Sequence, residues 1–189
     1  MTTGPMTKKR PLLLLSSTIT SLALGAGINV IDAPGTMVWF TRRSGGTLDT
    51  NPQADAAGVH ALLERMGDDG RALYLQEIVG FDIAFPIALL LMVHLAIVQA
   101  WTTRTSSTTL RRLLLVPWAA FAIDLCENAS AFALTSTFPR EPTALAGVIG
   151  SITTLKFIVY GAGLVIAVVG AALSLSAARR APGGSTGPT

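Results

Sequence analysis

The sequence predicts an all-α fold, a membrane-embedded four-helix bundle with a short amphipathic helix in its first outer loop. Half of the 189 residues are hydrophobic, the mean hydropathy is +0.55 and only 13% are charged, whereas soluble domains carry about 25% charged residues. The apolar residues are gathered into four long runs that basic residues flank. These three observations favour helices surrounded by lipid over a soluble core.

Each of the four runs is long enough to cross a bilayer, which takes ~20 apolar residues. We expect them to form one transmembrane domain over residues 12–175. The flanking residues lack the periodic apolar side chains that would offset the entropy of ordering, so we expect a disordered cytoplasmic N-terminus at 1–11 and a disordered cytoplasmic tail at 176–189. The predicted spans are about 12–31, 78–101, 113–135 and 145–175.

The first span has a second interpretation. It follows Lys8-Lys9-Arg10, and Gly25-Ala26-Gly27 resembles the small-residue cleavage site of a secretory signal. The apolar run is long for a signal and continues through Ile28 to Ile31. A retained signal-anchor helix is therefore the favoured prediction, with cleavage as the alternative.

The flanking charges predict the orientation. With four spans, the N-terminus, the 102–112 loop and the C-terminal tail lie on one side, which carries basic residues and no acid. The loops at 32–77 and 136–144 carry a mixture of arginines and acids. The positive-inside rule therefore places both termini in the cytoplasm.

The outer loop at 32–77 is the only substantial segment expected outside the membrane. Val59, Leu62, Leu63 and Met66 follow the i, i+3, i+4, i+7 spacing of one apolar helix face. We expect this helix to start at Asn51-Pro52, as N-cap and first helical residue. It should lie on the membrane surface or over the mouth of the bundle.

Beyond that helix, Gly67-Asp68-Asp69-Gly70 should break it, with Asp69 capping a new helix that runs into the second span. This new helix carries Arg71 and Tyr74. If the outer loop acts as a lid over a site in the bundle, these two are its candidate lid residues.

Four ionisable residues fall inside the predicted spans. A charged side chain at the centre of a membrane helix costs roughly 2.5–3.5 kcal/mol, so the four must pair, protonate or face water. Asp124, Glu127 and Asn128 share one helix face, as do Thr153, Lys156 and Tyr160. We expect the two faces to meet, with Asp82 approaching from the second span. The candidate ligand-binding residues are Asp82, Asp124, Glu127, Asn128, Lys156 and Tyr160.

Several classes of function are disfavoured. Cys126 is the only cysteine, so no intramolecular disulfide or CxxC pair is possible. His60 and His94 fall on different segments, which makes a zinc or haem site improbable, and we expect no metal and no cofactor. The net charge of +3 comes from topology signals, so nucleic acid is not an expected partner.

A set of short motifs carries a resemblance. Leu48-Asp49, Gly70-Arg71 with Tyr74, Asp82 with Phe85-Pro86, and Asp124 with Glu127-Asn128 resemble a group of small bacterial four-helix integral membrane proteins of uncharacterised function, over about residues 45 to 130. The resemblance implies a multi-pass protein of the plasma (inner) membrane. It brings no activity with it.

Three functions remain open at this point. The first is a pocket in the outer half of the membrane that binds a small cationic or amphipathic ligand or a lipid. The second is an intramembrane lipid-modifying enzyme that uses pairs of carboxylates as acid and base. The third is a structural or accessory membrane subunit whose small residues allow close helix packing. Membrane lipids are the expected partners in all three, and the sequence does not fix the oligomeric state.

Overall fold

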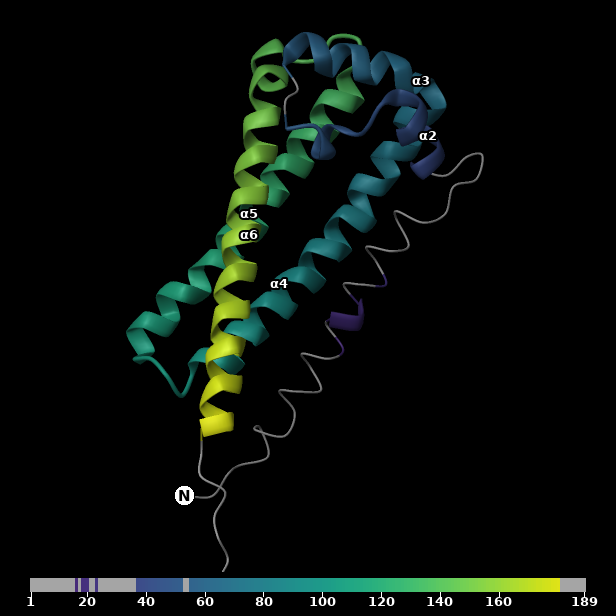
Figure 1. Cartoon of the computed structure of the whole chain (residues 1–189). Coiled ribbons are helices and arrows are strands. Elements are labelled where there is room, and N and C mark those ends of the chain that lie inside the picture. The colour runs from purple at the N-terminus through teal and green to yellow at the C-terminus, as the bar shows by residue number, and fades with distance from the viewer. Residues whose placement is uncertain (1–15, 17, 21–22, 24–36, 53–54, 181–189) are drawn as a thin grey trace, which may run out of the picture.

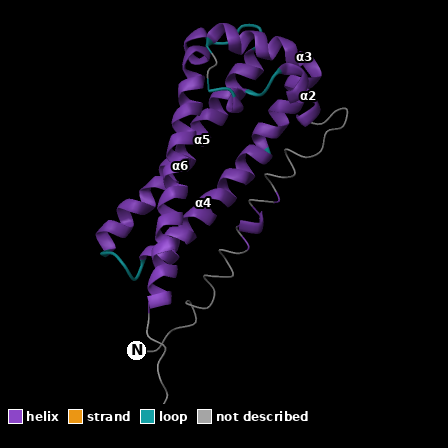
Figure 2. Cartoon of the chain, in the orientation of Figure 1, coloured by secondary structure: helices purple, strands orange, loops and turns teal. Residues whose placement is uncertain are grey.

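In the computed structural model of the chain, the described part consists of helices joined by loops and contains no strand (Figure 2). Most of the first predicted span lies outside the described residues, as do the two chain ends. The structure describes residues 16, 18–20, 23, 37–52 and 55–180.

Two short elements precede four longer helices. The short ones are α2 (Met37–Ser44) and the 3-10 helix η1 (Leu48–Thr50), and α3, α4, α5 and α6 follow. In Figure 1, α3, η1 and the connection between α5 and α6 lie together at one end of the molecule, which we call the α3 end. The long helices are α3 (Ala56–Val79), α4 (Phe81–Trp101), α5 (Ser107–Thr137) and α6 (Thr143–Arg180).

The first half of α3 is the amphipathic helix that the sequence predicts, with a different start. Asn51-Pro52 does not begin it, so that prediction is wrong. The N-cap is Asp55, whose carboxylate accepts a hydrogen bond from the Gly58 amide at 2.7 Å. An aspartate N-cap satisfies an amide that has no partner within the helix.

The predicted apolar face of α3 is confirmed. Val59, Leu62, Leu63 and Met66 are all buried. They pack at the α3 end, in a core that α3 shares with η1, α5 and α6. The other large members of this core are Leu48, Tyr74, Ile78, Leu134 and Ile149.

The break after this face occurs within α3, as a kink at Gly67. Its φ of 67° and ψ of 178° lie in a region that only glycine adopts easily. The side chain of Arg71, from the next turn, donates to the carbonyl of Leu63 at 2.7 Å. Arg71 therefore satisfies a carbonyl that the break frees.

The α5–α6 connection is fastened to α3. His60 Nδ1 lies 2.5 Å from Glu141 Oε1, and the Arg71 guanidinium lies 4.3 Å from the centre of the Phe138 ring. The helices on either side exceed the predicted spans. α5 begins at Ser107 instead of 113, which places Arg111 and Arg112 on the helix rather than in a loop.

At the opposite end, α4 and α6 approach closely at Gly170. A Cβ atom there would lie 2.7 Å from the Cβ of Ala100, so any side chain would force the helices apart. Trp101 donates its indole N–H to the carbonyl of Ile166 at 3.1 Å. This tryptophan thus joins α4 to α6.

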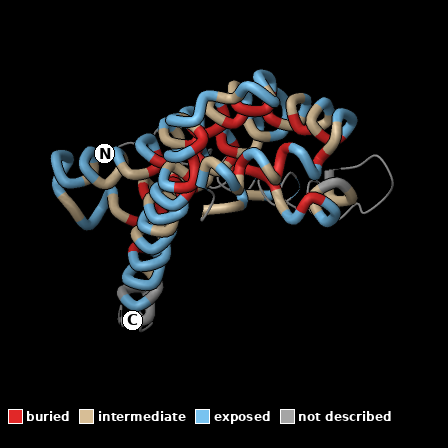
Figure 3. The backbone as a smooth tube through the Cα atoms, turned by 90° about the horizontal axis from the view of Figure 1, so that it is seen from above, coloured by how far each residue is buried: buried red, intermediate tan, exposed pale blue. Residues whose placement is uncertain are grey.

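Two of the described helices are long and apolar enough to cross a membrane: the continuous α3–α4 segment over Ala56–Trp101, and Thr143–Ser174 of α6. Only 28% and 11% of their most apolar stretches are buried. Seen along the molecule, α6 is exposed over most of its length toward the C-terminus (Figure 3). The apolar side chains of these helices therefore point mainly outward.

Candidate functional site

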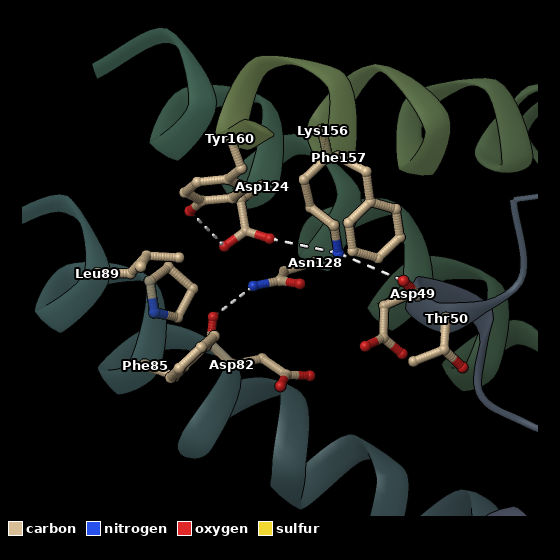
Figure 4. Close-up of a pocket in the computed structure, with 11 residues that line it drawn as sticks. Asp49, Thr50, Asp82, Phe85, Leu89, Asp124, Asn128, Lys156, Phe157 and Tyr160 are labelled. Carbon is tan, nitrogen blue, oxygen red and sulfur yellow. Dashed lines mark hydrogen bonds and ion pairs between the residues drawn. The ribbon is translucent and has the colours of Figure 1, made fainter. Parts of the chain in front are cut away.

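A cavity of about 380 Å³ lies between α4, α5 and α6, below η1. Its volume falls within the ~300–1,000 Å³ of ordinary ligand pockets. Figure 4 shows its lining, in which polar groups converge from all four elements. The lining residues are Asp49, Thr50, Asp82, Phe85, Pro86, Leu89, Asp124, Asn128, Lys156, Phe157 and Tyr160.

Lys156 is the only cation in this lining. Its ammonium group forms ion pairs with Glu127 and, at 3.6 Å, with Asp124 Oδ1. It also donates to the main-chain carbonyl of Asp49 at 3.3 Å. The polar faces of α5 and α6, which the sequence predicts to meet, are therefore joined through Lys156.

Glu127 lies behind the cavity wall. Its side chain is fully buried, and it accepts a hydrogen bond from the Thr153 hydroxyl in addition to pairing with Lys156. A carboxylate held by two partners in this way is a support for Lys156 rather than a surface for a ligand. Of the six candidate ligand-binding residues, Glu127 alone does not line the cavity.

Asn128 has a structural task that follows from Pro86. In an α-helix the Asp82 carbonyl would accept from the amide of residue 86, but proline has no N–H. The Asn128 side chain, 6% exposed, donates to this carbonyl at 2.5 Å. A side chain of the neighbouring helix α5 therefore satisfies the carbonyl that Pro86 frees.

Unlike the side chains of Lys156, Glu127 and Asn128, the side chain of Asp82 has no hydrogen-bond or ion-pair partner within the described part of the chain. Its carboxylate points into the cavity from α4, and that of Asp49 points into the same region from η1 (Figure 4). Two carboxylates therefore face one space, and the nearby Lys156 is already paired with two others.

Asp49 is the ionisable lining residue that the site prediction missed. It lies in a loop, where helical periodicity gives no information about contacts. The one sequence feature that could have indicated it is the group of motifs that carries the resemblance, which includes both Leu48-Asp49 and Tyr74. The structure joins the two, since the Tyr74 hydroxyl donates to Asp49 Oδ1 at 3.0 Å.

The two candidate lid residues have separate roles. Tyr74 is fully buried and holds Asp49 at the roof of the cavity. Arg71 does not line the cavity. Its contacts are with Leu63, Asp68 and Phe138, so it stabilises the α3 end instead.

The remaining wall combines one polar group with apolar ones. The Tyr160 hydroxyl lies 3.5 Å from Asp124 Oδ2, within hydrogen-bonding range but long. Phe85, Leu89 and Phe157 supply apolar surface around it. The site is thus amphipathic, with Phe157 beside Lys156 near η1 and Leu89 on the side of Asp124 and Tyr160 (Figure 4).

Among the described residues, no group of three or more His, Cys, Asp or Glu side chains is arranged to hold a metal ion. Comparison with protein-family models, with curated proteins and with solved structures gives no match to this chain. The functional argument therefore rests on the geometry of the cavity.

Proposed function

We propose that the chain is an integral membrane protein in which α4, α5 and α6 cross the bilayer together with the predicted span at 12–31. Two apolar helices of sufficient length support this proposal, as do the large apolar side chains exposed on all three described helices. In water such a surface would favour aggregation. The most exposed examples are Leu115, Ile158, Val165 and Val168.

The proposed orientation has the α3 end outside and both termini in the cytoplasm. Arg104, Arg111 and Arg112 lie around the α4–α5 connection, at the opposite end from α3. The acids Asp49, Asp55, Glu64, Asp68 and Asp69 lie on or beside η1 and α3, at the α3 end. This separation fits the positive-inside rule for a multi-pass protein of the plasma membrane.

We infer that the cavity binds a small amphipathic molecule with a cationic group. The observation that carries this inference is the Asp82 carboxylate, which faces the cavity without a partner in the described structure. Asp49, Asp82, Asp124 and Glu127 surround a single ammonium group, that of Lys156. A second cation would offset the cost of placing these carboxylates away from bulk water.

The apolar lining defines the rest of the ligand. Phe85, Leu89 and Phe157 offer surface for a hydrocarbon or aromatic portion, and an aromatic ring face also attracts a cation. A purely inorganic cation would leave this surface unused. A structural role for the polar residues explains the Lys156–Glu127 pair but not the cavity.

A lipid-modifying enzyme is the second candidate, and one contact favours it. The Tyr160 hydroxyl and the Asp124 carboxylate adjoin each other on the cavity wall, where a proton donor and acceptor could both reach a bound substrate. Mass spectrometry of lipids after incubation with the protein tests this alternative, since an enzyme would generate a product of altered mass.

The test of the binding proposal uses dodecylamine and the thermal unfolding of the purified protein in a neutral detergent. A ligand at 100 times its dissociation constant stabilises by about 2.7 kcal/mol, which corresponds to a Tm increase of about 5–11 °C at ~2–4 °C per kcal/mol. Dodecanol, which has the same chain without the charge, should give a much smaller shift.

Asp82→Asn should abolish the response to dodecylamine while folding normally, because Asp82 has no partner to lose in the described structure. Asp69→Asn is the matched control. It removes an exposed acid from α3 that does not line the cavity and should respond like the wild type. An undiminished dodecylamine shift in Asp82→Asn would contradict the proposal.

A further inference from the structure

The walls of the cavity close three of its sides and leave the side between α4 and α6. Toward the α3 end it is roofed by η1. Leu48 of η1 is fully buried in the core, and Asp49 is held by Tyr74 at 3.0 Å and by Lys156 at 3.3 Å. Thr154 of α6 adds a hydrogen bond of 3.4 Å to the carbonyl of Pro52. The roof is therefore tied to both α3 and α6.

At the opposite end the cavity is closed by the crossing of α4 and α6. A Cβ at Gly163 would lie 3.4 Å from Val93 and 3.7 Å from Val116, so the three helices are in contact there. The rear wall is α5, from which the buried side chains of Asp124 and Asn128 project into the cavity.

The remaining side lies between α4 and α6. Phe157, on the α6 margin, is 52% exposed. Phe85, Leu89 and Tyr160 are half-buried, which places them at a rim rather than in a core. Within the described ranges, neither α2 nor α3 contributes to the lining.

The surface beside this rim is apolar on both helices. Ile87 of α4 is 42% exposed and Ile158 of α6 is 62% exposed. In the membrane arrangement proposed above, hydrocarbon chains contact such a surface. None of the described residues outside η1, α4, α5 and α6 lines the cavity, so within the described part of the chain an opening between α4 and α6 faces lipid.

We propose that the ligand is an amine-bearing lipid that enters the cavity sideways from the bilayer, between α4 and α6. This inference rests on the proposed binding function and names its substrate class. The amine lies between the carboxylates of Asp49 and Asp82, and the hydrocarbon chain passes Leu89 and Phe157 into the membrane.

The order of groups along the cavity matches that of a lipid. Asp82 lies near the outer end of α4, and Leu89 follows seven residues later, about 10 Å deeper at 1.5 Å per residue. The carboxylates of Asp49 and Asp82 thus lie nearer the head groups than Leu89 does. A water-soluble amine would use only the first part of this surface.

The first test compares dodecylamine with butylamine on the full chain reconstituted in phosphatidylcholine nanodiscs. Both probes carry the same ammonium group, and each CH₂ that is buried adds about 0.8 kcal/mol. The proposal expects dodecylamine to raise the Tm at an aqueous concentration at least about tenfold lower than butylamine needs. An empty-nanodisc partition measurement corrects both probes to their concentrations in the membrane.

Equal potency after this correction would overturn lateral entry by a lipid while leaving the amine pocket intact. No shift with either probe would overturn the binding proposal as well. Leu89→Trp, which fills the lining, should abolish the dodecylamine shift. Leu91→Trp is its matched control, because Leu91 lies on the same helix, is 49% exposed and does not line the cavity.

A second test does not depend on the folding of Leu89→Trp. In a Cys126→Ser background, Phe157→Cys should react with a lipid-soluble maleimide at least about tenfold faster than with a membrane-impermeant one, and dodecylamine should slow the reaction. Ile158→Cys, on the outward surface, should react with the lipid-soluble reagent but without protection. Faster labelling of position 157 by the impermeant reagent would overturn the proposal.

Discussion

Replacement of Asn128 by leucine tests whether the Asn128 side chain stabilises the protein by bonding the Asp82 carbonyl that Pro86 leaves free. Leucine keeps the approximate volume of the side chain but removes the N–H that donates to the Asp82 carbonyl at 2.5 Å. Pro86 cannot supply a replacement. A buried carbonyl without a partner costs about 1–3 kcal/mol. At ~2–4 °C per kcal/mol, we expect the Tm to fall by about 2–12 °C.

A second substitution isolates the cause of this loss. Pro86→Ala restores an N–H four residues after Asp82, which allows the ordinary helical hydrogen bond to form. In the leucine background it should recover much of the stability. Interhelical hydrogen bonds in membrane proteins show coupling of about 0.6 kcal/mol on average and up to about 1.7, so the coupling between positions 128 and 86 should fall in that range.

The measurement is thermal unfolding of the two single variants and the double variant in detergent, followed by tryptophan fluorescence. Ser130→Ala is the control on α5, because the Ser130 hydroxyl bonds within its own helix, to Cys126 at 2.7 Å. It should change stability by less than about 0.5 kcal/mol. If Asn128→Leu costs the same with alanine as with proline at position 86, the carbonyl is not the reason for the loss.

Two further predictions concern the helix contacts, and unfolding in detergent checks both. Lys156→Met leaves the Glu127 carboxylate buried without its cation and should cost about 3–5 kcal/mol. Adding Glu127→Gln should recover part of that loss, and a double variant less stable than Lys156→Met would contradict the pairing. Gly170→Ala places a methyl group against Trp101 and should destabilise by about 1–3 kcal/mol. Gly147→Ala, where the methyl group meets nothing within 4 Å, should be neutral or stabilising by up to about 1 kcal/mol; equal losses at both positions would contradict close packing at Gly170.

Helical periodicity accounts for the parts of the structure that could be predicted. The spacing of Val59, Leu62, Leu63 and Met66 identified the buried face of α3. The spacing of Asp124 and Asn128, and of Lys156 and Tyr160, identified side chains that share one cavity. In each case the information is local, because residues three and four apart on a helix lie on one face.

The predictions that failed needed information from outside a single helix. Asn51-Pro52 has the composition of a helix start, but the helix begins at Ala56, with Asp55 as its N-cap. Several small polar residues in this segment can cap, and composition alone does not rank them. Asp49 was missed because a loop residue has no periodicity, and its place at the cavity depends on contacts with Tyr74 and Lys156, which are distant in sequence.

The structure divides the polar cluster according to what each group already contacts. The Glu127 carboxylate pairs with Lys156, and the Asn128 amide serves the main-chain carbonyl that Pro86 frees. These contacts satisfy the demands of helices packed in an apolar surrounding, so loss of stability is their expected phenotype. The Asp82 carboxylate has no such contact in the described structure. Only the main-chain carbonyl of Asp82 is bonded, to the Asn128 side chain. Substitution of Asp82 should therefore affect binding without unfolding, and that separation distinguishes a ligand pocket from a structural network.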